Sequence, residues 1–336
     1  MERPCVRVPR EAGEETRQAL AAADLVDEDH EIVVDEGLLY LPVTDPDAVD
    51  DEYDVIYRDV PAHDRQQTPA DVLGFAPSYE RLGDVAILDA DDPERAGRVA
   101  EAILDSDLPV RAVLNRASKV KGDLRVRDWT VLATDEDADG EGRSPTETVH
   151  REYGFEYHLD LATVYFSPRL ATERHRVTAQ VEAGEHAVDM FAGVGPFAIP
   201  MAARGATVVG VDLNPAAVEY LRENARRNAV AESVTAIEGD VRDVAADYEG
   251  WADRLVMNLP HSADEFLDAA VTLAGEDCVL HYYDIQHEDD PFGPGERAIR
   301  EAADHAGYDV DVLTRHVVRS YAPHELNVCL DVRLSR

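Results

Sequence analysis

Acidic residues end three successive strands that are predicted in the second half of the chain. Asp189 ends the first strand, Asp212 ends the second, and Asp240 closes the turn that follows the third. The carboxyl ends of parallel strands meet at one edge of a sheet, so these side chains are expected to lie close together. Asp212 is placed there to accept hydrogen bonds from the ribose hydroxyls of an adenosine ligand, and Asp240 to reach the adenine amino group. Acids at this edge suit a cationic adenosine ligand, which predicts a site for S-adenosylmethionine (SAM).

A glycine-rich segment, 189–197 (DMFAGVGPF), joins the first of these strands to a helix. Gly193 and Gly195 allow the backbone to approach a ligand closely, and Phe191 lies in the same turn. Asn214 can cap the helix that follows the second strand. The segment has neither the GxGxxG spacing of dinucleotide sites nor the Lys-Ser/Thr of a phosphate loop. Alone it is equally well explained as a structural turn, and the three strand-ending acids favour the SAM site.

The fourth predicted strand of this series ends in Asn258-Leu259-Pro260. A side-chain amide has both donors and an acceptor, so an Asn held by a rigid Pro can bind the edge of a planar base. The plainer interpretation is a turn in which the Asn side chain bonds only its own backbone. On the same sheet edge as a SAM site, the base-binding interpretation is favoured.

The order of predicted elements indicates an α/β fold. From about residue 155 to the end, strands alternate with helices, which predicts a mostly parallel sheet with helices on both faces. Two smaller α+β units precede it. We predict an N-terminal domain at 1–65, a linker at 66–77, a middle domain at 78–154 and the SAM-binding domain at 155–336. Within 44–77, only 55–57 reads as a short strand.

The charge composition is extreme. Seventy Asp and Glu against 32 Lys and Arg give a formal net charge of −38. This predicts adaptation to a salt-rich cytoplasm, where salt screens self-repulsion; a cation-binding or nucleic-acid-mimicking protein is the rival interpretation. No run of 18 apolar residues and no apolar leader are present, and the three dispersed cysteines fit a reducing compartment. The expected location is the cytoplasm, with no membrane partner.

With these motifs in place, the chain resembles the archaeal and eukaryotic tRNA guanine-N1 methyltransferases that act at position 37, next to the anticodon. The resemblance covers nearly the whole chain and implies a class I (Rossmann-like) SAM-dependent methyltransferase domain preceded by two smaller domains, the first of which docks on tRNA. The blocks that carry it, in the family's order, are 82–87, Arg125, 148–154, 164–174, 189–197, 258–260, 266–270 and 319–323.

The resemblance also implies roles for individual residues. Removing the N1 proton of guanine pushes negative charge onto O6, so the site needs a base near N1 and a cation near O6. Glu173 matches the family's general base and Arg125 its O6 stabiliser. Asn258 and Pro260 would hold the flipped guanine. Tyr165 matches a residue that shapes the methionine end of the SAM site.

A basic stretch offsets the overall acidity, which by itself argues against a nucleic-acid partner. Residues 111–127 hold six basic side chains against the single acid Asp123, and they include Lys119 and Lys121, the only lysines of the chain. Phosphates need focused positive charge, so this stretch is expected to contact tRNA. Arg174 is expected to extend this surface, and Arg169 to line the RNA-facing entrance. Chance clustering on a solvated hairpin is the alternative.

Three other functions remain open at the level of sequence. One is an aminocarboxypropyl transferase of the wybutosine pathway, which uses another alkyl arm of SAM. A second is a bifunctional relative that also methylates a tricyclic guanosine derivative. The third, from another class, is a non-catalytic RNA-binding protein that kept the fold. No metal site is predicted, Mg²⁺ is left open as an added cofactor, and a monomer is expected.

Overall fold

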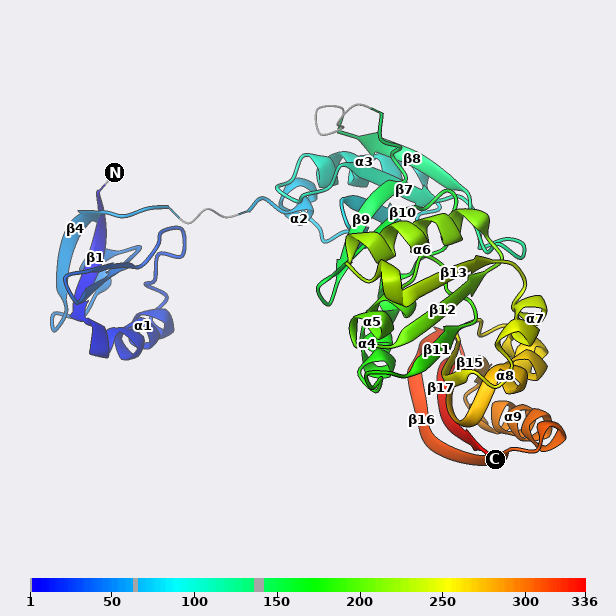
Figure 1. Ribbon diagram of the computed structural model, residues 1–336. Helices are drawn as coiled ribbons and strands as arrows, with labels where there is room; N and C mark the ends of the chain where they lie inside the picture. The colour runs from blue at the N-terminus through cyan, green and yellow to red at the C-terminus, as the bar shows by residue number, and fades with distance from the viewer. Residues whose placement is uncertain (1, 63–65, 136–141) are drawn as a thin grey trace. The chain divides into compact units, whose positions relative to one another are not determined.

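The computed structural model describes residues 2–62, 66–135 and 142–336. These fall into two compact units, Met1–Thr68 and Pro69–Arg336, shown as ribbons in Figure 1. In the described residues no helix is long and apolar enough to cross a membrane.

The first unit is a four-stranded antiparallel sheet with one helix. Its strand order is β2-β3-β1-β4. The elements are β1 (Glu2–Pro9), α1 (Gly13–Ala22), β2 (Val33–Asp35), β3 (Leu38–Pro42) and β4 (Asp54–Asp59). Strand β1 was not expected from the sequence. The short strand at 55–57 is the middle of β4, which pairs with β1 along six residues and so belongs to the sheet.

The second unit begins with helix α2 (Pro69–Leu73), inside the predicted linker. A four-stranded sheet of order β5-β6-β7-β8 follows, with α3 packed on it. Its elements are β5 (Glu80–Leu82), β6 (Val85–Leu88), α3 (Pro93–Leu104), β7 (Ala112–Arg116) and β8 (Trp129–Thr134). Asp92 caps α3, because its Oδ1 accepts the backbone N–H groups of Glu94 and Arg95 at 3.0 and 3.2 Å. The acidic, Gly-containing composition of 134–145 predicts a solvated loop, and residues 136–141 of it lie outside the described residues.

A hairpin crosses the predicted start of the SAM-binding domain. Strands β9 (Glu147–Glu152) and β10 (Phe155–Asp160) pair from Glu152–Phe155 to Glu147–Asp160. Two residues of β10 form backbone hydrogen bonds with asparagine side chains. Glu156 pairs with Asn228, the residue that ends helix α6 (Pro215–Arg227), and His158 pairs with Asn224 within that helix. A boundary between residues 154 and 155 therefore divides one local structure.

The largest sheet has seven strands in the order β13-β12-β11-β14-β15-β17-β16. Strands β11 to β15 run parallel to one another, and β17 pairs antiparallel with both β15 and β16. The strands are β11 (His186–Asp189), β12 (Thr207–Asp212), β13 (Val234–Glu238), β14 (Ala252–Met257), β15 (Ala274–His287), β16 (Asp309–Ala322) and β17 (Glu325–Ser335). The mostly parallel sheet is as predicted, whereas β16 was missed.

Helices cover both faces of this sheet (Figure 1). One apolar cluster joins the sheet to α4, α5 and α6, and a second joins its other face to α7, α8 and α9. The remaining helices are α4 (Ala171–Thr178), α5 (Ala198–Ala203), α7 (Val241–Val244), α8 (Leu267–Leu273) and α9 (Gly293–Ala306). This layering leaves the carboxyl edge of the parallel strands as the place where loops from β11, β12, β13 and β14 converge.

Candidate active site

Asp189 lies at the carboxyl end of β11 with a carboxylate that the protein leaves half satisfied. Its side chain is buried, Oδ1 accepts the backbone N–H of Phe191 at 3.4 Å, and Oδ2 has no hydrogen-bond partner in the structure. Burial raises the pKa of Asp189 to about 7, and the nearby Asp212 adds to the rise. A buried oxygen without a donor is costly, so it favours a cationic or donor ligand at this place.

Asp212, at the end of β12, ties two turns together. Its Oδ2 accepts the backbone N–H of Gly193 at 2.7 Å, and its Oδ1 accepts that of Asn214 at 2.9 Å. Burial raises the pKa of Asp212 despite these two bonds. The carboxylate thus fixes the glycine turn beside the next strand, and its role in holding a ribose stays a prediction.

The two glycines of the turn have different surroundings. Gly193 has φ +52°, and a Cβ added there would meet nothing within 4 Å. Gly195 has φ +96°, and a Cβ there would press on the side chains of Leu221 and Ile199. Gly195 therefore allows close packing of α5 and α6, whereas Gly193 leaves open space beside the two acids. That space and the unpartnered oxygen of Asp189 fit the cationic adenosine ligand expected from the sequence.

Three other residues that were predicted to bind SAM, Asn214, Asp240 and Phe191, differ in the contacts that they make near this edge. Asn214 is buried, its Oδ1 accepts the N–H of Ala216 at 3.0 Å and its Nδ2 donates to the carbonyl of Thr163 at 2.8 Å. Both ends of the amide are thus used inside the protein, and Asn214 acts here as a helix cap. Asp240 caps α7 and pairs with Arg242, which lowers the pKa of its carboxyl. Phe191 packs edge-to-face on Phe266 at 5.0 Å.

Glu173 is buried on α4, and donors surround its carboxylate. Arg176 donates from Nε to Oε2 and from Nη2 to Oε1, both at 2.8 Å. The hydroxyl of Tyr283 donates to Oε1 at 2.8 Å, and Nε2 of His316 lies 3.2 Å from Oε2. Tyr283 also contacts Phe197, the last residue of the glycine-rich segment, at 6.0 Å between ring centroids. The Tyr283–Phe197 contact thus connects Glu173 to the glycine-rich segment at the carboxyl edge of the parallel strands.

Arg125 and Asn258-Leu259-Pro260 lie in one neighbourhood. The guanidinium of Arg125 sits over the ring of the exposed Tyr165 at 5.9 Å, and its backbone has φ +55°. Its charge helps to lower the pKa of His261, after burial, which is the larger cause. His261 directly follows Pro260, whose carbonyl accepts the N–H of Ile285 at 3.1 Å. Residues far apart in sequence therefore lie near one another, and their roles in binding guanine stay predictions.

The basic stretch is partly on the surface. Lys119 and Lys121 are exposed, and Lys121 pairs with Asp128. A hollow of about 360 Å³ opens at this loop, lined by residues of 121–128 and Ala162. Arg111 is 4% exposed and donates to the backbone carbonyls of Ser144 and Glu147, so it does not belong to this surface.

Arg174 does not extend the basic surface, and that prediction is wrong. Its side chain is 3% exposed, forms a two-pronged ion pair with the buried Glu152, and donates to the carbonyl of Ser167. It anchors α4 to the β9–β10 hairpin. Arg169 is exposed, as expected for an entrance residue, and pairs with Glu80.

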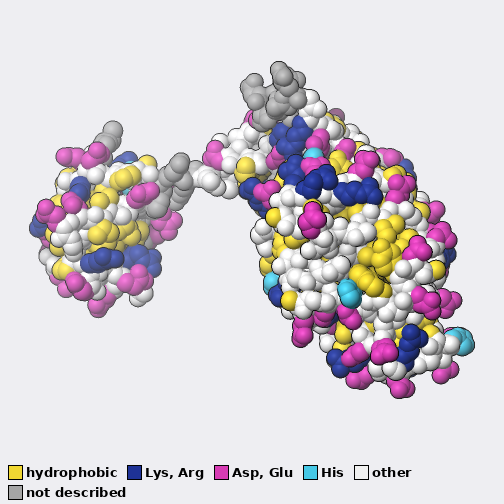
Figure 2. Space-filling model, in the orientation of Figure 1, with side chains coloured by type: hydrophobic (Ala, Val, Ile, Leu, Met, Phe, Trp, Pro, Cys, Tyr) yellow, Lys and Arg dark blue, Asp and Glu magenta, His cyan; other side chains and the backbone are white. Residues whose placement is uncertain are grey.

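Positive charge also gathers outside the basic stretch 111–127 (Figure 2). Figure 2 shows Lys and Arg side chains grouped on the upper part of the larger unit, near α6, while acidic side chains are spread over the rest of the visible face. Helix α6 carries Arg226 and Arg227 in its last turn. A net charge of −38 is therefore compatible with local positive surface.

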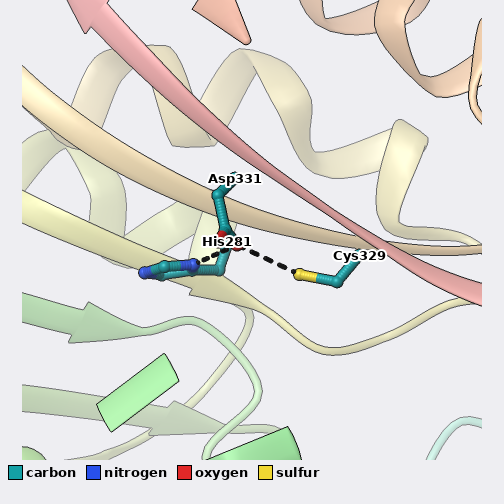
Figure 3. A group of neighbouring side chains, drawn as sticks. All are labelled: His281, Cys329 and Asp331. Atoms are coloured by element: carbon teal, nitrogen blue, oxygen red, sulfur yellow. Dashed lines mark hydrogen bonds and ion pairs between the residues drawn. The ribbon is translucent and has the colours of Figure 1, made fainter. Parts of the chain in front are cut away.

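A buried cluster of three potential metal ligands was missed by sequence reasoning. It consists of His281, Cys329 and Asp331, drawn in Figure 3. Asp331 accepts hydrogen bonds from Arg176 and from Nδ1 of His281, and Arg254 occupies Nε2 of His281 at 2.8 Å. With two guanidinium groups on its donor atoms, this cluster does not fit a cation. The three cysteines are buried and free, as expected.

Comparisons with known proteins show the family of this chain. Models for the "TRM5/TYW2 methyltransferase domain", the "tRNA methyltransferase 5 N-terminal domain" and the "TYW2 N-terminal domain" match residues 148–312, 5–51 and 65–137. The tRNA (guanine(37)-N(1))-methyltransferase Trm5b of Pyrococcus abyssi is 37% identical over 98% of both chains. The chain belongs to the Trm5 family. A Trm5b of Methanocaldococcus jannaschii is 32% identical over 99% of both chains.

Solved structures of the Trm5 family agree with the fold. The crystal structure of P. abyssi Trm5b has a TM-score of 0.74 at 36% identity and covers 99% of this chain and all of its own. A complex of a Trm5 with a leucine tRNA has a TM-score of 0.75 at 30% identity, covering 98% and 99%. The three-part architecture expected from the sequence, two smaller domains before a class I methyltransferase domain, is therefore correct for this chain.

Proposed function

We propose that this chain transfers a methyl group from SAM to N1 of the guanosine at position 37 of tRNA. The observation that carries the proposal is similarity along the whole chain to relatives named for this reaction. The site adds the parts that the reaction needs: a buried carboxylate at Glu173, a half-buried cation at Arg125, and acids beside open space at Asp189 and Asp212.

The cofactor is SAM, and related structures hold AdoMet or adenosine. When bound, it supplies an electrophilic methyl group on a cationic sulfur. Asp189 would offer its unpartnered Oδ2 to the positive charge, and Asp212 would hold the ribose while keeping the Gly193 turn in place. The space beside Gly193 lets the ligand lie against the backbone.

The remaining residues act on the guanine. Asn258 and Pro260 would hold the flipped base by its edge, and Glu173 would accept the N1 proton. Arg125 would stabilise the negative charge that moves to O6. Tyr165, under the Arg125 guanidinium, would help to fix that cation. Because the displacement is in line, positioning supplies much of the acceleration.

Transfer of the aminocarboxypropyl group of SAM is the second candidate. A tRNA(Phe) (4-demethylwyosine(37)-C(7)) aminocarboxypropyltransferase of Pyrococcus horikoshii is 32% identical, and the match covers 94% of that protein but 80% of this chain. The match of residues 5–51 to the Trm5 N-terminal domain favours methylation. A bifunctional relative would use the same site, and a non-catalytic RNA-binding protein would have no need of a buried Glu173.

The test is transfer from SAM labelled in the methyl group or in the aminocarboxypropyl group to unmodified tRNA at molar KCl. The substrate with guanosine at position 37 is compared with its inosine and adenosine variants, and the products are analysed as nucleosides by mass spectrometry. We expect 1-methylguanosine from the guanosine substrate only. Product from the adenosine variant, or an aminocarboxypropyl product, would contradict the proposal.

We further propose a monomer that works in a salt-rich cytoplasm. A net charge of −38 with no compensating lysine-rich surface supports a medium in which salt screens self-repulsion. Activity and light scattering are to be measured from low salt to molar KCl; activity that peaks at low salt, or a dimer at the optimum, would contradict this proposal.

A further inference from the structure

A line of buried and half-buried polar side chains runs across strands β14, β15 and β17 of the seven-stranded sheet and ends at Glu173. Arg254 on β14 donates from Nε and Nη2 to the two carboxylate oxygens of Glu185, at 2.7 and 2.9 Å. Its Nη1 lies 2.8 Å from Nε2 of His281 on β15. Asp331 on β17 then joins His281 to Arg176, which holds Glu173 (Figure 3 shows the His281–Asp331 contact).

The contacts fix the protonation of His281. A guanidinium can only donate, so Nε2 of His281 accepts from Arg254, and the ring proton sits on Nδ1. That N–H donates to Oδ1 of Asp331 at 2.7 Å. Burial lowers the pKa of His281, which agrees with a neutral ring. Asp331 is therefore the charged partner that meets Arg176 from the sheet side.

Arg176 divides one positive charge between two carboxylates. Toward Glu173 it makes two bonds of 2.8 Å, and toward Asp331 it donates from Nη1 at 2.6 Å and from Nη2 at 3.1 Å. Arg176 and His281 together hold the pKa of Asp331 far below its usual range despite burial. A carboxylate that stays ionised draws the guanidinium toward itself over the whole working pH range.

We propose that Asp331 is a positioning residue for methyl transfer, which keeps Glu173 in place and makes it a stronger base by sharing Arg176 with it. This rests on the proposed role of Glu173. A cation that pairs with one carboxylate alone stabilises its ionised form and weakens it as a base. The other groups facing Glu173 are Tyr283 on β15, His316 on β16 and Cys329 on β17. None of these groups carries a negative charge, so Asp331 is the second carboxylate that shares Arg176 with Glu173.

The test is Asp331→Asn in the full chain. Single-turnover methyl transfer is followed with saturating SAM and tRNA from about pH 4 to about pH 8, in a His316→Gln background that removes the half-buried histidine beside Glu173. In the Asp331→Asn variant, Glu173 is the only carboxylate that remains paired with Arg176. We expect the acid limb of the rate profile to move to lower pH by about half a unit to one unit, and the plateau rate to fall roughly threefold to tenfold because the base is weaker.

Two further variants separate charge from packing. Cys329→Ser changes a group 3.4 Å from Oδ1 of Asp331 without changing charge, and we expect its limb to stay in place. His281→Leu removes a donor from Asp331, which should then attract Arg176 more strongly and move the limb to higher pH. The second variant tests the proposal even if Asp331→Asn does not fold, and SAM binding serves as the folding check for all three.

An unmoved limb in Asp331→Asn, or a limb that moves the same way in His281→Leu, would overturn the proposal. Failure of the underlying function has a different signature. If Glu173→Gln retains the parent rate, Glu173 is not the base and the proposed mechanism fails as well. If Glu173→Gln abolishes transfer while the Asp331→Asn profile matches the parent, only the role of Asp331 is lost.

Discussion

Asp189 and Asp212 on one side, and Asp331 on the other, are acids of the larger unit that the protein holds in opposite ways. Asp189 and Asp212 lie at the sheet edge, where they accept backbone N–H groups but form no ion pair among the described residues, and burial raises the pKa of both. Asp331 lies deeper in the sheet, bonded to Arg176 and to His281, and its pKa is lowered. Asp189 and Asp212 therefore have no cationic partner among the described residues, whereas Asp331 is paired with Arg176.

This difference separates binding from positioning. A buried carboxylate without a cation costs stability and gains it back when a cationic ligand binds. A buried carboxylate with its cation stabilises the fold and holds its neighbours in place. The contrast is open to direct test, because the two kinds of acid should respond oppositely to removal of their charge.

The largest expected effect is on stability at Asp331. Asp331→Ala leaves Arg176 and His281 without their shared acceptor, and we expect a loss of about 3 kcal/mol in the free energy of unfolding near neutral pH. Urea unfolding measures it. Asp277→Ala is the matched control, because Asp277 forms an exposed pair with Arg333 and should change little. Equal effects in both variants would remove the contrast.

Asp189→Asn should act in the other direction. The folded pKa of about 7 lies above the ordinary carboxyl value of about 3.9, so ionisation of Asp189 reduces stability as pH rises from about 4 to about 7. Removing that charge should stabilise the ligand-free protein at about pH 8 by on the order of 2 kcal/mol. SAM affinity should fall at the same time. A destabilised ligand-free variant would show that Asp189 is structural.

The same pKa predicts a pH dependence of SAM binding. Below about pH 7 the Asp189 carboxyl is protonated in the free protein and must lose its proton to meet a cation. The affinity should weaken by up to about tenfold for each pH unit below 7, with proton release on binding. Calorimetry in two buffers of different ionisation enthalpy measures both. Affinity that is flat from about pH 5 to about pH 8 would contradict a role for Asp189 in binding.

The smallest effect is expected at the exposed lysines, where water weakens each contact. Lys119→Glu with Lys121→Glu should weaken tRNA binding about fivefold at moderate salt and flatten its salt dependence. The control is Arg297→Glu with Arg333→Glu, which changes total charge equally on exposed residues elsewhere. An unchanged salt slope in the lysine variant would remove these residues from the tRNA surface, and the acid contrast would stand without them.

The sequence predicted what depends on local signals. Asn214 caps a helix as expected, because an Asn followed by Pro is a strong helix-start signal; Asp92 before Pro93 shows the same local rule. The strand-ending Asp189 and Asp212 meet because parallel strands share a carboxyl edge. These signals were enough to predict that the two acids share one sheet edge and to predict the type of fold.

What the sequence did not predict depends on distant pairing. Arg176 and Asp331 are separated by 155 residues, and only the packing of α4 on β17 makes them partners. Arg174 looked like part of a basic surface, yet Glu152 of the hairpin holds it inside. Strand β16 was missed because its side chains alternate irregularly at a sheet edge with three register shifts. No window of sequence contains these relations.

The measurement that tests the account most directly is single-turnover methyl transfer to guanosine 37 by Glu173→Gln, with SAM and tRNA both shown to be bound. Gln keeps the shape of the side chain but cannot accept the N1 proton. We predict normal binding of both ligands and a rate that falls by at least about 100-fold. A rate within a fewfold of the parent, at the same 1-methylguanosine product, would contradict the assignment of Glu173 as the base.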